Sequence, residues 1–160
     1  MKEKQLSETG CCPRFDPKPW DEKELTWNNK LFVKDKTFAF LHIPLNLEKV
    51  IGRMWNKVKK ANAVSEEFLM LAYDPSPWTN EQYIAVSKEV PEMENVGISG
   101  TFLTKVFEGP YKDARKWVTE MKNYVESKGK HMEKLYFFYT TCPKCAEVYG
   151  KNYVVGFAQI

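Results

Sequence analysis

The stretch Leu47-Glu-Lys-Val-Ile-Gly-Arg-Met-Trp-Asn-Lys-Val58 places apolar side chains three and four residues apart, which is the spacing of an amphipathic helix. The same spacing returns 67 residues later in Ala114-Arg-Lys-Trp-Val-Thr-Glu-Met-Lys-Asn-Tyr-Val125. Strand-like runs precede both helices, one opening at Thr37-Phe38 and the other at Thr101-Phe102. Few identities survive between the two copies, so order and periodicity are the evidence that the chain contains one unit twice.

The apolar runs on either side of the two helices predict six strands. The expected helices cover about 46–60, with Asn46 as N-cap, and 111–128. The expected strands cover 32–43, 68–73, 83–90, 101–108, 135–141 and 152–160. The sequence therefore predicts an α+β fold. Its two tandem strand–helix–strand–strand modules would have antiparallel sheets and two main helices, a pseudo-twofold and a central ligand groove.

The predicted domain organisation is an N-terminal arm, 1–31, followed by a small-molecule-binding domain, 32–160, with modules at about 32–92 and 97–160. Several predicted strands are apolar on both faces, although only two helices are available to cover them. The arm, the other module or a ligand must cover the remaining faces. This shortage of cover is the physical argument for a binding cleft.

Composition and charge exclude several classes of protein. The net charge is only +3, with 24 Lys and Arg interspersed among 21 Asp and Glu, so we expect no nucleic-acid partner. The start is polar and resembles no secretory signal, and no stretch approaches the roughly 20 apolar residues of a membrane span. We therefore expect a cytoplasmic protein with no membrane partner. The sequence does not fix the oligomeric state.

The four cysteines form two pairs, Cys11-Cys12 and Cys142-Pro-Lys-Cys145. A Cys-x-x-Cys knuckle can hold half of a tetrahedral zinc site, with the N-terminal pair as the other half. Adjacent cysteines suit such a site poorly, because successive side chains point apart. The favoured interpretation is a turn whose thiols pack under the arm, so the sequence predicts no metal and no cofactor.

Aromatic residues make up 14% of the chain, more than a small sheet needs for its core. Rings that line a cavity stack on flat ligands and attract cations. Packing inside each module is the alternative for every ring. The candidates for lining a groove are Trp78, Tyr83, Tyr111, Tyr136, Phe137 and Tyr139.

Two carboxylates are candidates for catalysis or for balancing a cationic ligand. Glu108 is expected to end its strand just before the corner Gly109-Pro110, where it could face a cleft or lie exposed beside a helix N-terminus. Glu81 is expected in a loop, where carboxylates are usually solvated. His42 and His131 lack partners at ligand spacing, so neither indicates a triad or a metal site.

The stretch Gly100-Thr-Phe-Leu-Thr-Lys-Val-Phe-Glu-Gly-Pro-Tyr111, followed by a helix containing Trp117, resembles the strand–Gly-Pro-Tyr–helix segment of the gyrase-inhibitor-like (GyrI-like) proteins. Tyr73-Asp-Pro-Ser-Pro-Trp-Thr-Asn-Glu-Gln-Tyr83 resembles that family's passage from second to third strand. The resemblance covers about 32–160. It implies a tandem αβ fold whose groove accepts bulky aromatic, often cationic, compounds.

Members of this family are multidrug-responsive regulators, stand-alone drug binders or hydrolases of cyclopropane-bearing toxins. This chain has no appended DNA-binding helix-turn-helix, so the resemblance implies a stand-alone binder or an enzyme. Many relatives carry a buried Glu in a Glu-x-Tyr pattern on the strand after the second helix. Phe137 and Tyr139 are the matching positions here, so the aromatic is kept and the acid is absent.

Three functions remain open at this point. In the first, the chain binds amphipathic aromatic molecules for sequestration or detoxification. Alternatively, it hydrolyses electrophilic toxins, with Glu108 or Glu81 as general base and tyrosine hydroxyls orienting water. In the third, it is a zinc- or thiol-stabilised interaction module.

Overall fold

The computed structural model describes residues 16–41, 43–67, 69–140 and 152–160. Their backbone forms two compact units, which are described separately. Thr26–Thr101 form the α1 unit, and the described parts of Met1–Leu25 and Phe102–Ile160 form the α2 unit. The long strands β1 (Lys23–Phe40) and β5 (Glu94–Glu108) each begin in one unit and end in the other.

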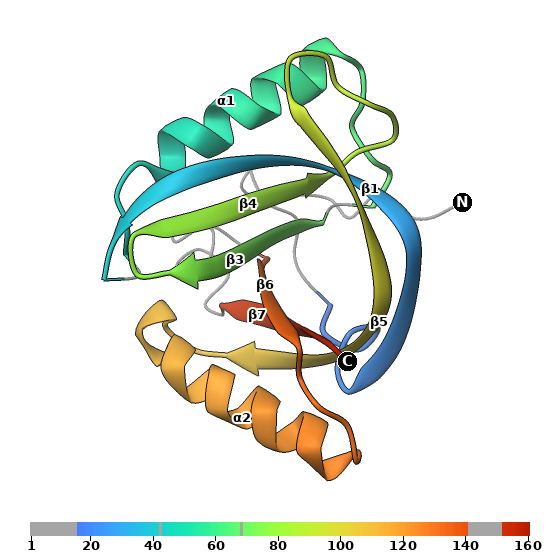
Figure 1. Ribbon diagram of the computed structural model, residues 1–160, viewed down its shortest axis with the longest axis vertical. Helices are drawn as coiled ribbons and strands as arrows, with labels where there is room; N and C mark the ends of the chain where they lie inside the picture. The colour runs from blue at the N-terminus through green and yellow to red at the C-terminus, as the bar shows by residue number, and fades with distance from the viewer. Residues whose placement is uncertain (1–15, 42, 68, 141–151) are drawn as a thin grey trace. The chain divides into compact units, whose positions relative to one another are not determined.

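The α1 unit contains β1, the short strand β2 (Ile43–Pro44), helix α1 (Leu47–Lys60), β3 (Met70–Ser76) and β4 (Thr79–Ala85). β4 pairs antiparallel with β1 on one side and with β3 on the other, and β2 pairs antiparallel with the end of β1. Figure 1 shows α1 lying along one face of this sheet. Helix and sheet enclose one core, in which Val33 and Ile84 meet Val50, Met54 and Val58 of α1.

The α2 unit contains β5, the short 3₁₀ helix η1 (Tyr111–Asp113), α2 (Ala114–Ser127), β6 (Lys134–Tyr139) and β7 (Tyr153–Gln159). β7 pairs antiparallel with both β5 and β6. The helix covers one sheet face (Figure 1), where Leu103, Phe107 and Val154 pack against Trp117 and Met121 of α2.

The predicted α+β fold is confirmed: both helices and antiparallel strand pairs are present. Each helix has 14 residues, and their starts lie 67 residues apart, as the repeated pattern predicts. Strands differ more in their ends, because β1 starts nine residues before the expected Phe32 and β5 seven before Thr101. Apolar runs mark the buried part of a strand and miss its polar extension.

Asn46 is the N-cap of α1, as predicted, but its side chain makes no capping hydrogen bond. The Asn46 Oδ1 atom instead accepts a hydrogen bond of 3.0 Å from the backbone N–H of Phe38, which ties the start of α1 to the end of β1. Neither helix could cross a bilayer: in the described parts of the chain, no helix combines the necessary length and apolar character.

Candidate functional site

The face of the β1–β4–β3 sheet that points away from α1 is the place where chemically active side chains meet. Successive side chains of a strand point to opposite faces. Val33 and Ile84 pack beneath α1, so their neighbours Lys34 and Tyr83 point to the other face, where they stand directly opposite each other. Glu81, two residues before Tyr83 on β4, shares that face.

Lys34, Glu81 and Tyr83 form a connected group, the Glu81 cluster. The Lys34 Nζ atom lies 3.2 Å from Glu81 Oε1, and the Tyr83 hydroxyl donates a hydrogen bond of 2.6 Å to the same oxygen. The Lys34 ammonium also lies 5.8 Å from the centre of the Tyr83 ring. The side chains of Lys34 and Glu81 are only 19% and 12% exposed. Their interaction is therefore screened by water less than that of a surface ion pair.

Aromatic and aliphatic side chains surround this charged group on the same sheet. Phe32 meets the Tyr83 ring edge-on, with the ring centres 6.4 Å apart, and Trp27 lies 5.7 Å from Phe32. On β3, the buried Leu71 stands opposite Tyr83, and Tyr73 stands opposite Glu81. A carboxylate among apolar side chains attracts a cation more strongly than a solvated one, because water screens the attraction less.

The prediction that Glu81 lies in a loop is wrong. It lies on β4, because the turn after β3 is shorter than the sequence suggested: the two prolines of Asp74-Pro-Ser-Pro77 do not end the hairpin, and β4 starts at Thr79. Glu81 and Tyr83 thus have the Glu-x-Tyr spacing that the sequence lacks at Phe137 and Tyr139, on a different strand.

Sequence reasoning missed Lys34 altogether. It lies between Val33 and Asp35 in the run Leu31-Phe-Val-Lys-Asp-Lys-Thr37, where a lysine is easily taken for solvated surface. Its importance depends on the β1–β4 register, which places it opposite Tyr83. Because β1 contains several other charged residues, its sequence gives no signal that distinguishes Lys34.

The α2 unit places its predicted residues on two different faces. Tyr136 is buried on the face opposite α2, where its ring lies 6.3 Å from that of Phe102 and 4.9 Å from the Lys134 Nζ atom. Phe137 and Tyr139 pack at the cluster beneath α2, with Phe137 6.3 Å from Trp117. Phe137 and Tyr139 therefore contribute to the packing of the α2 unit.

The remaining candidates are Glu108, Trp78 and Tyr111. Glu108 is exposed at the end of β5, opposite Tyr153. Trp78 is exposed in the turn between β3 and β4. The side chain of Tyr111 lies outside the described part of the chain, as do Cys11, Cys12, Cys142 and Cys145. Among the residues that the structure describes, no group of three or more His, Cys, Asp and Glu side chains is arranged to hold a metal ion.

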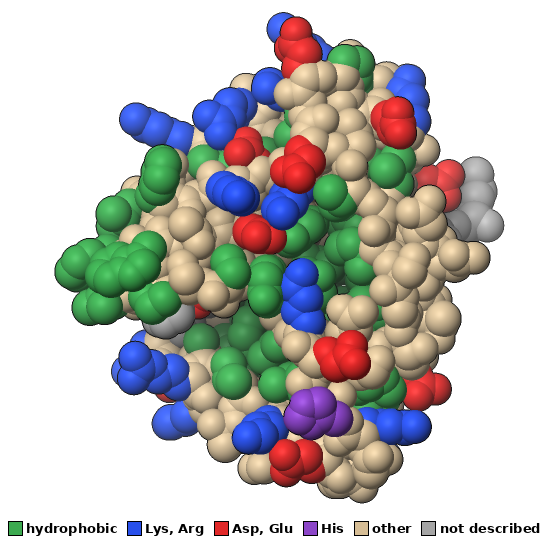
Figure 2. Space-filling view, viewed as in Figure 1, with side chains coloured by type: hydrophobic (Ala, Val, Ile, Leu, Met, Phe, Trp, Pro, Cys, Tyr) green, Lys and Arg blue, Asp and Glu red, His purple; other side chains and the backbone are tan. Residues whose placement is uncertain are grey.

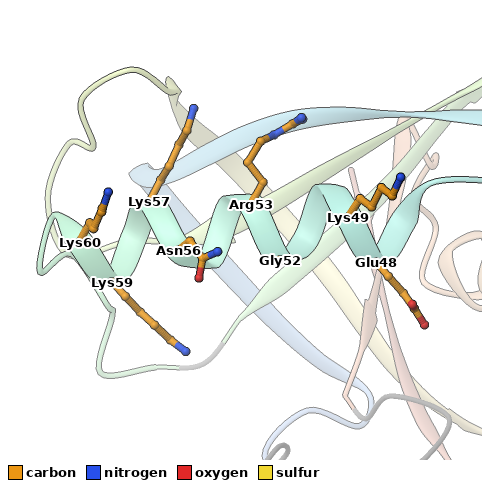
Figure 3. A pocket seen from close by; sticks show the side chains of 8 residues that line it. All are labelled: Glu48, Lys49, Gly52, Arg53, Asn56, Lys57, Lys59 and Lys60. Carbon is orange, nitrogen blue, oxygen red and sulfur yellow. The ribbon is translucent and has the colours of Figure 1, made fainter.

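A shallow hollow lies along the outer face of α1 and is predominantly basic. In Figure 3, the side chains of Lys49, Arg53, Lys57 and Lys60 point the same way, and those of Glu48 and Lys59 point the opposite way. Arg53 reaches Asp35 on β1, with 2.8 Å between Nη2 and Oδ2. The hollow is open to solvent and no aromatic or aliphatic residue lines it, so it fits amphipathic ligands poorly.

The family of the chain follows from its whole length. The model of a family described as "Bacterial hydrolase" matches residues 2–160. The chain belongs to this bacterial hydrolase family. Comparison with the curated proteins gives no match.

Solved structures with this fold include proteins of different function. The C-terminal domain of EcmrR has a TM-score of 0.69 at 14% identity, with 88% of this chain and 96% of that chain covered. A hydrolase from Listeria innocua has a TM-score of 0.60 at 11% identity, covering 87% and 91%. The protein SAV2435, solved with bound tetraphenylphosphonium, has a TM-score of 0.54 at 10% identity, covering 87% and 93%. These proteins have the GyrI-like fold, so the resemblance seen in the sequence is confirmed.

Proposed function

We propose that this bacterial hydrolase family member binds amphipathic aromatic small molecules, cationic ones among them, for sequestration or detoxification. The observation that carries the proposal is the Glu81 carboxylate, largely buried on an aromatic sheet face and hydrogen-bonded to Tyr83. Buried carboxylates beside aromatic rings attract lipophilic cations through both the charge and the ring faces. The structural relative with bound tetraphenylphosphonium supports this ligand class.

A cationic ligand would compete with a cation that is already present. Lys34 holds its ammonium 3.2 Å from the Glu81 oxygen. A lipophilic cation would bind by taking the place of this ammonium, and its rings would contact the nearly buried Tyr83 ring, which is 4% exposed, once the ammonium has moved away. Neutral aromatic molecules would leave the Lys34–Glu81 pair intact and use the rings alone.

The binding test compares tetraphenylphosphonium with neutral triphenylphosphine oxide by calorimetric titration. Glu81→Gln should weaken the cation by about 1–3 kcal/mol, because a charge-assisted contact is lost, and should leave the neutral compound nearly unchanged. Glu108→Gln is the matched control, since that carboxylate is exposed and lies in the α2 unit. Equal affinities in wild type and Glu81→Gln would remove Glu81 from the proposal.

Hydrolysis is the second candidate, favoured by the short hydrogen bond between Tyr83 and Glu81 and by the family to which the chain belongs. Glu81 would take a proton from water while the water oxygen bonds to an electrophilic ring carbon. The strained carbon–carbon bond would break, its electron pair would pass to the rest of the ring system, and the proton would return there from Glu81. Tyr83 would fix the orientation of the carboxylate.

Hydrolysis is tested with a cyclopropane-containing alkylator and mass spectrometry of the ring-opened product. Glu81→Gln should reduce turnover by about 10²–10⁴-fold with little change in neutral substrate binding, while Glu108→Gln should match wild type. If wild type yields no more product than buffer, hydrolysis fails for this substrate class and the binding proposal stands by itself.

The finer architecture predicted from the sequence, two tandem modules with a pseudo-twofold and a ligand groove, is also part of the proposal. Support comes from the order of elements, because in each unit a long strand is followed by a 14-residue helix and then by two strands. The division into an arm of 1–31 and a binding domain of 32–160, and a cytoplasmic location, stay predictions.

A further inference from the structure

One end of the α1 unit exposes a cluster of large apolar side chains, the apolar tip. It combines the end of β1, the turn that leads to α1, and the β3–β4 turn. Figure 2 shows hydrophobic side chains gathered where these segments meet. The members are Phe38, Phe40, Leu41, Leu45 and Trp78, each between 55% and 72% exposed. Contiguous exposed apolar groups of this size mark a contact surface.

The backbone holds the apolar tip together, so its exposure is built into the fold. The Leu45 N–H donates a hydrogen bond of 2.9 Å to the Phe38 carbonyl, and the Ala39 N–H donates one of 2.8 Å to the Trp78 carbonyl. The rings of Phe40 and Trp78 lie 5.9 Å apart. Three chain segments therefore present their apolar side chains from one fixed surface.

Leu41 supplies an independent observation. It directly follows β1 and has a φ of 48°, in the left-handed region. Asn, Asp and Gly suit this conformation, whereas a leucine is uncommon there and costs about 1 kcal/mol. A leucine in this strained and exposed conformation indicates that its side chain serves a contact.

The charges beside the apolar tip indicate what it contacts. Helix α1 begins at Leu47, two residues after Leu45, and carries five cationic side chains against one carboxylate, Glu48; Arg53 is also paired with Asp35 of β1. Lys49, Arg53, Lys57 and Lys60 point the same way along the helix (Figure 3). Trp, Phe and Leu next to Lys and Arg is the composition of surfaces that lie on anionic bilayers, where rings and aliphatic chains enter the interface and cations meet lipid phosphates.

We infer that the apolar tip and the basic face of α1 form a docking surface for an anionic lipid bilayer. The expectation of no membrane partner rests on the lack of a long apolar stretch that could span a bilayer. A docking surface requires a few exposed apolar side chains and nearby cations, which a hydropathy pattern does not reveal. The inference is independent of the Glu81 cluster, whose residues lie elsewhere on the sheet.

The test is flotation of the full chain with vesicles of phosphatidylcholine alone or with one quarter phosphatidylglycerol. Wild type should float with the anionic vesicles and much less with the neutral ones. Leu41→Asn combined with Leu45→Ser should weaken flotation at least about tenfold, because two inserted side chains are lost. Asn suits the positive φ of Leu41, so thermal stability should not fall. Val118→Ser, an exposed apolar position on α2, is the matched control and should float like wild type.

Charge is tested with Lys49→Glu combined with Lys60→Glu, which should reduce flotation on anionic vesicles and leave the low neutral-vesicle level unchanged. Failure of wild type to float, equal flotation on both vesicle types, or unchanged flotation of the tip variant would each overturn the inference. A dimer in sedimentation velocity that the tip variant dissolves, with no flotation, would assign the tip to a second copy of the chain instead.

Discussion

The two sheets each use one face for a helix, but their opposite faces differ in chemistry. In the α1 unit, the face away from the helix carries the ion pair of Lys34 and Glu81 beside Tyr83. In the α2 unit, the corresponding strands carry Phe138 and Phe157, on which Trp20 packs edge-on at 6.2 and 5.6 Å. Both faces bury their rings, but the first also contains a partly buried ion pair, whereas the second contains an aromatic cluster.

This difference indicates separate roles for the two faces. The segment around Trp20 is fastened to the α2 sheet: the Thr104 hydroxyl donates hydrogen bonds to the carbonyls of Trp20 and Lys23, and Asp21 accepts one of 3.1 Å from the Val106 N–H. A segment held over the sheet in this way should stabilise the folded protein. A partly buried ion pair contributes little to stability, because desolvation offsets the attraction, so its presence on the α1 sheet favours a functional interpretation.

Removing the Trp20 ring, which covers the α2-unit face, should have the largest effect on stability. Trp20→Ala should lower the free energy of unfolding by about 2–3 kcal/mol, because aromatic contacts with Phe138 and Phe157 are lost. Tetraphenylphosphonium affinity should change little. The measurement is urea unfolding with a parallel titration. Trp78→Ala, which removes an exposed ring, should stay within about 0.5 kcal/mol. A stable Trp20→Ala protein that has lost ligand affinity would reverse the roles given to the faces.

Alanine substitutions of two glycines test how tightly α1 and α2 are packed. A Cβ at Gly156 on β7 would lie 2.9 Å from the Sδ atom of Met121 on α2, so Gly156→Ala should destabilise the protein by about 1–3 kcal/mol. A Cβ at Gly52 on α1 would meet open space, so Gly52→Ala should stabilise it by about 0.5–1 kcal/mol. Thermal unfolding of both variants distinguishes them. Shifts of the same sign would contradict the packing described here.

The smallest effect concerns pH. Burial, reinforced by the nearby carboxylates of Glu22, Asp21 and Glu24, raises the pKa of Tyr124 above its ordinary value. The stability that this contributes is fully present below about pH 10, the ordinary tyrosine pKa, and is lost as pH rises through the folded-state value. Tyr124→Phe should therefore lose less stability than wild type between pH 9 and 11 in urea unfolding. Parallel pH profiles would show that Tyr124 has the same pKa in both states.

The sequence predicts the helices well because periodicity depends only on neighbours along the chain. Both helices start within three residues of the expected position, and the 67-residue offset is correct. Strand faces were predicted less well. Tyr136 and Phe137 are adjacent, so they point to opposite faces, and nothing in the run Leu135–Tyr139 shows which face meets α2.

The Glu81 cluster shows the same limit at the candidate site. Glu81 and Tyr83 were candidates from their residue types, but the hydrogen bond between them depends on Glu81 being in a strand. Lys34 lies 47 residues before Glu81, and only the register of β1 and β4 brings the two together. Pairing between distant strands is the information that a single sequence does not contain.

The central claim is that a ligand cation takes the place of the Lys34 ammonium at Glu81, and Lys34→Met tests it most directly. This variant keeps the length of the side chain and leaves the carboxylate without its cation. Calorimetric titration should show tetraphenylphosphonium binding about tenfold more tightly than to wild type, with triphenylphosphine oxide nearly unchanged. Unchanged or weaker binding of the cation by Lys34→Met would contradict the account.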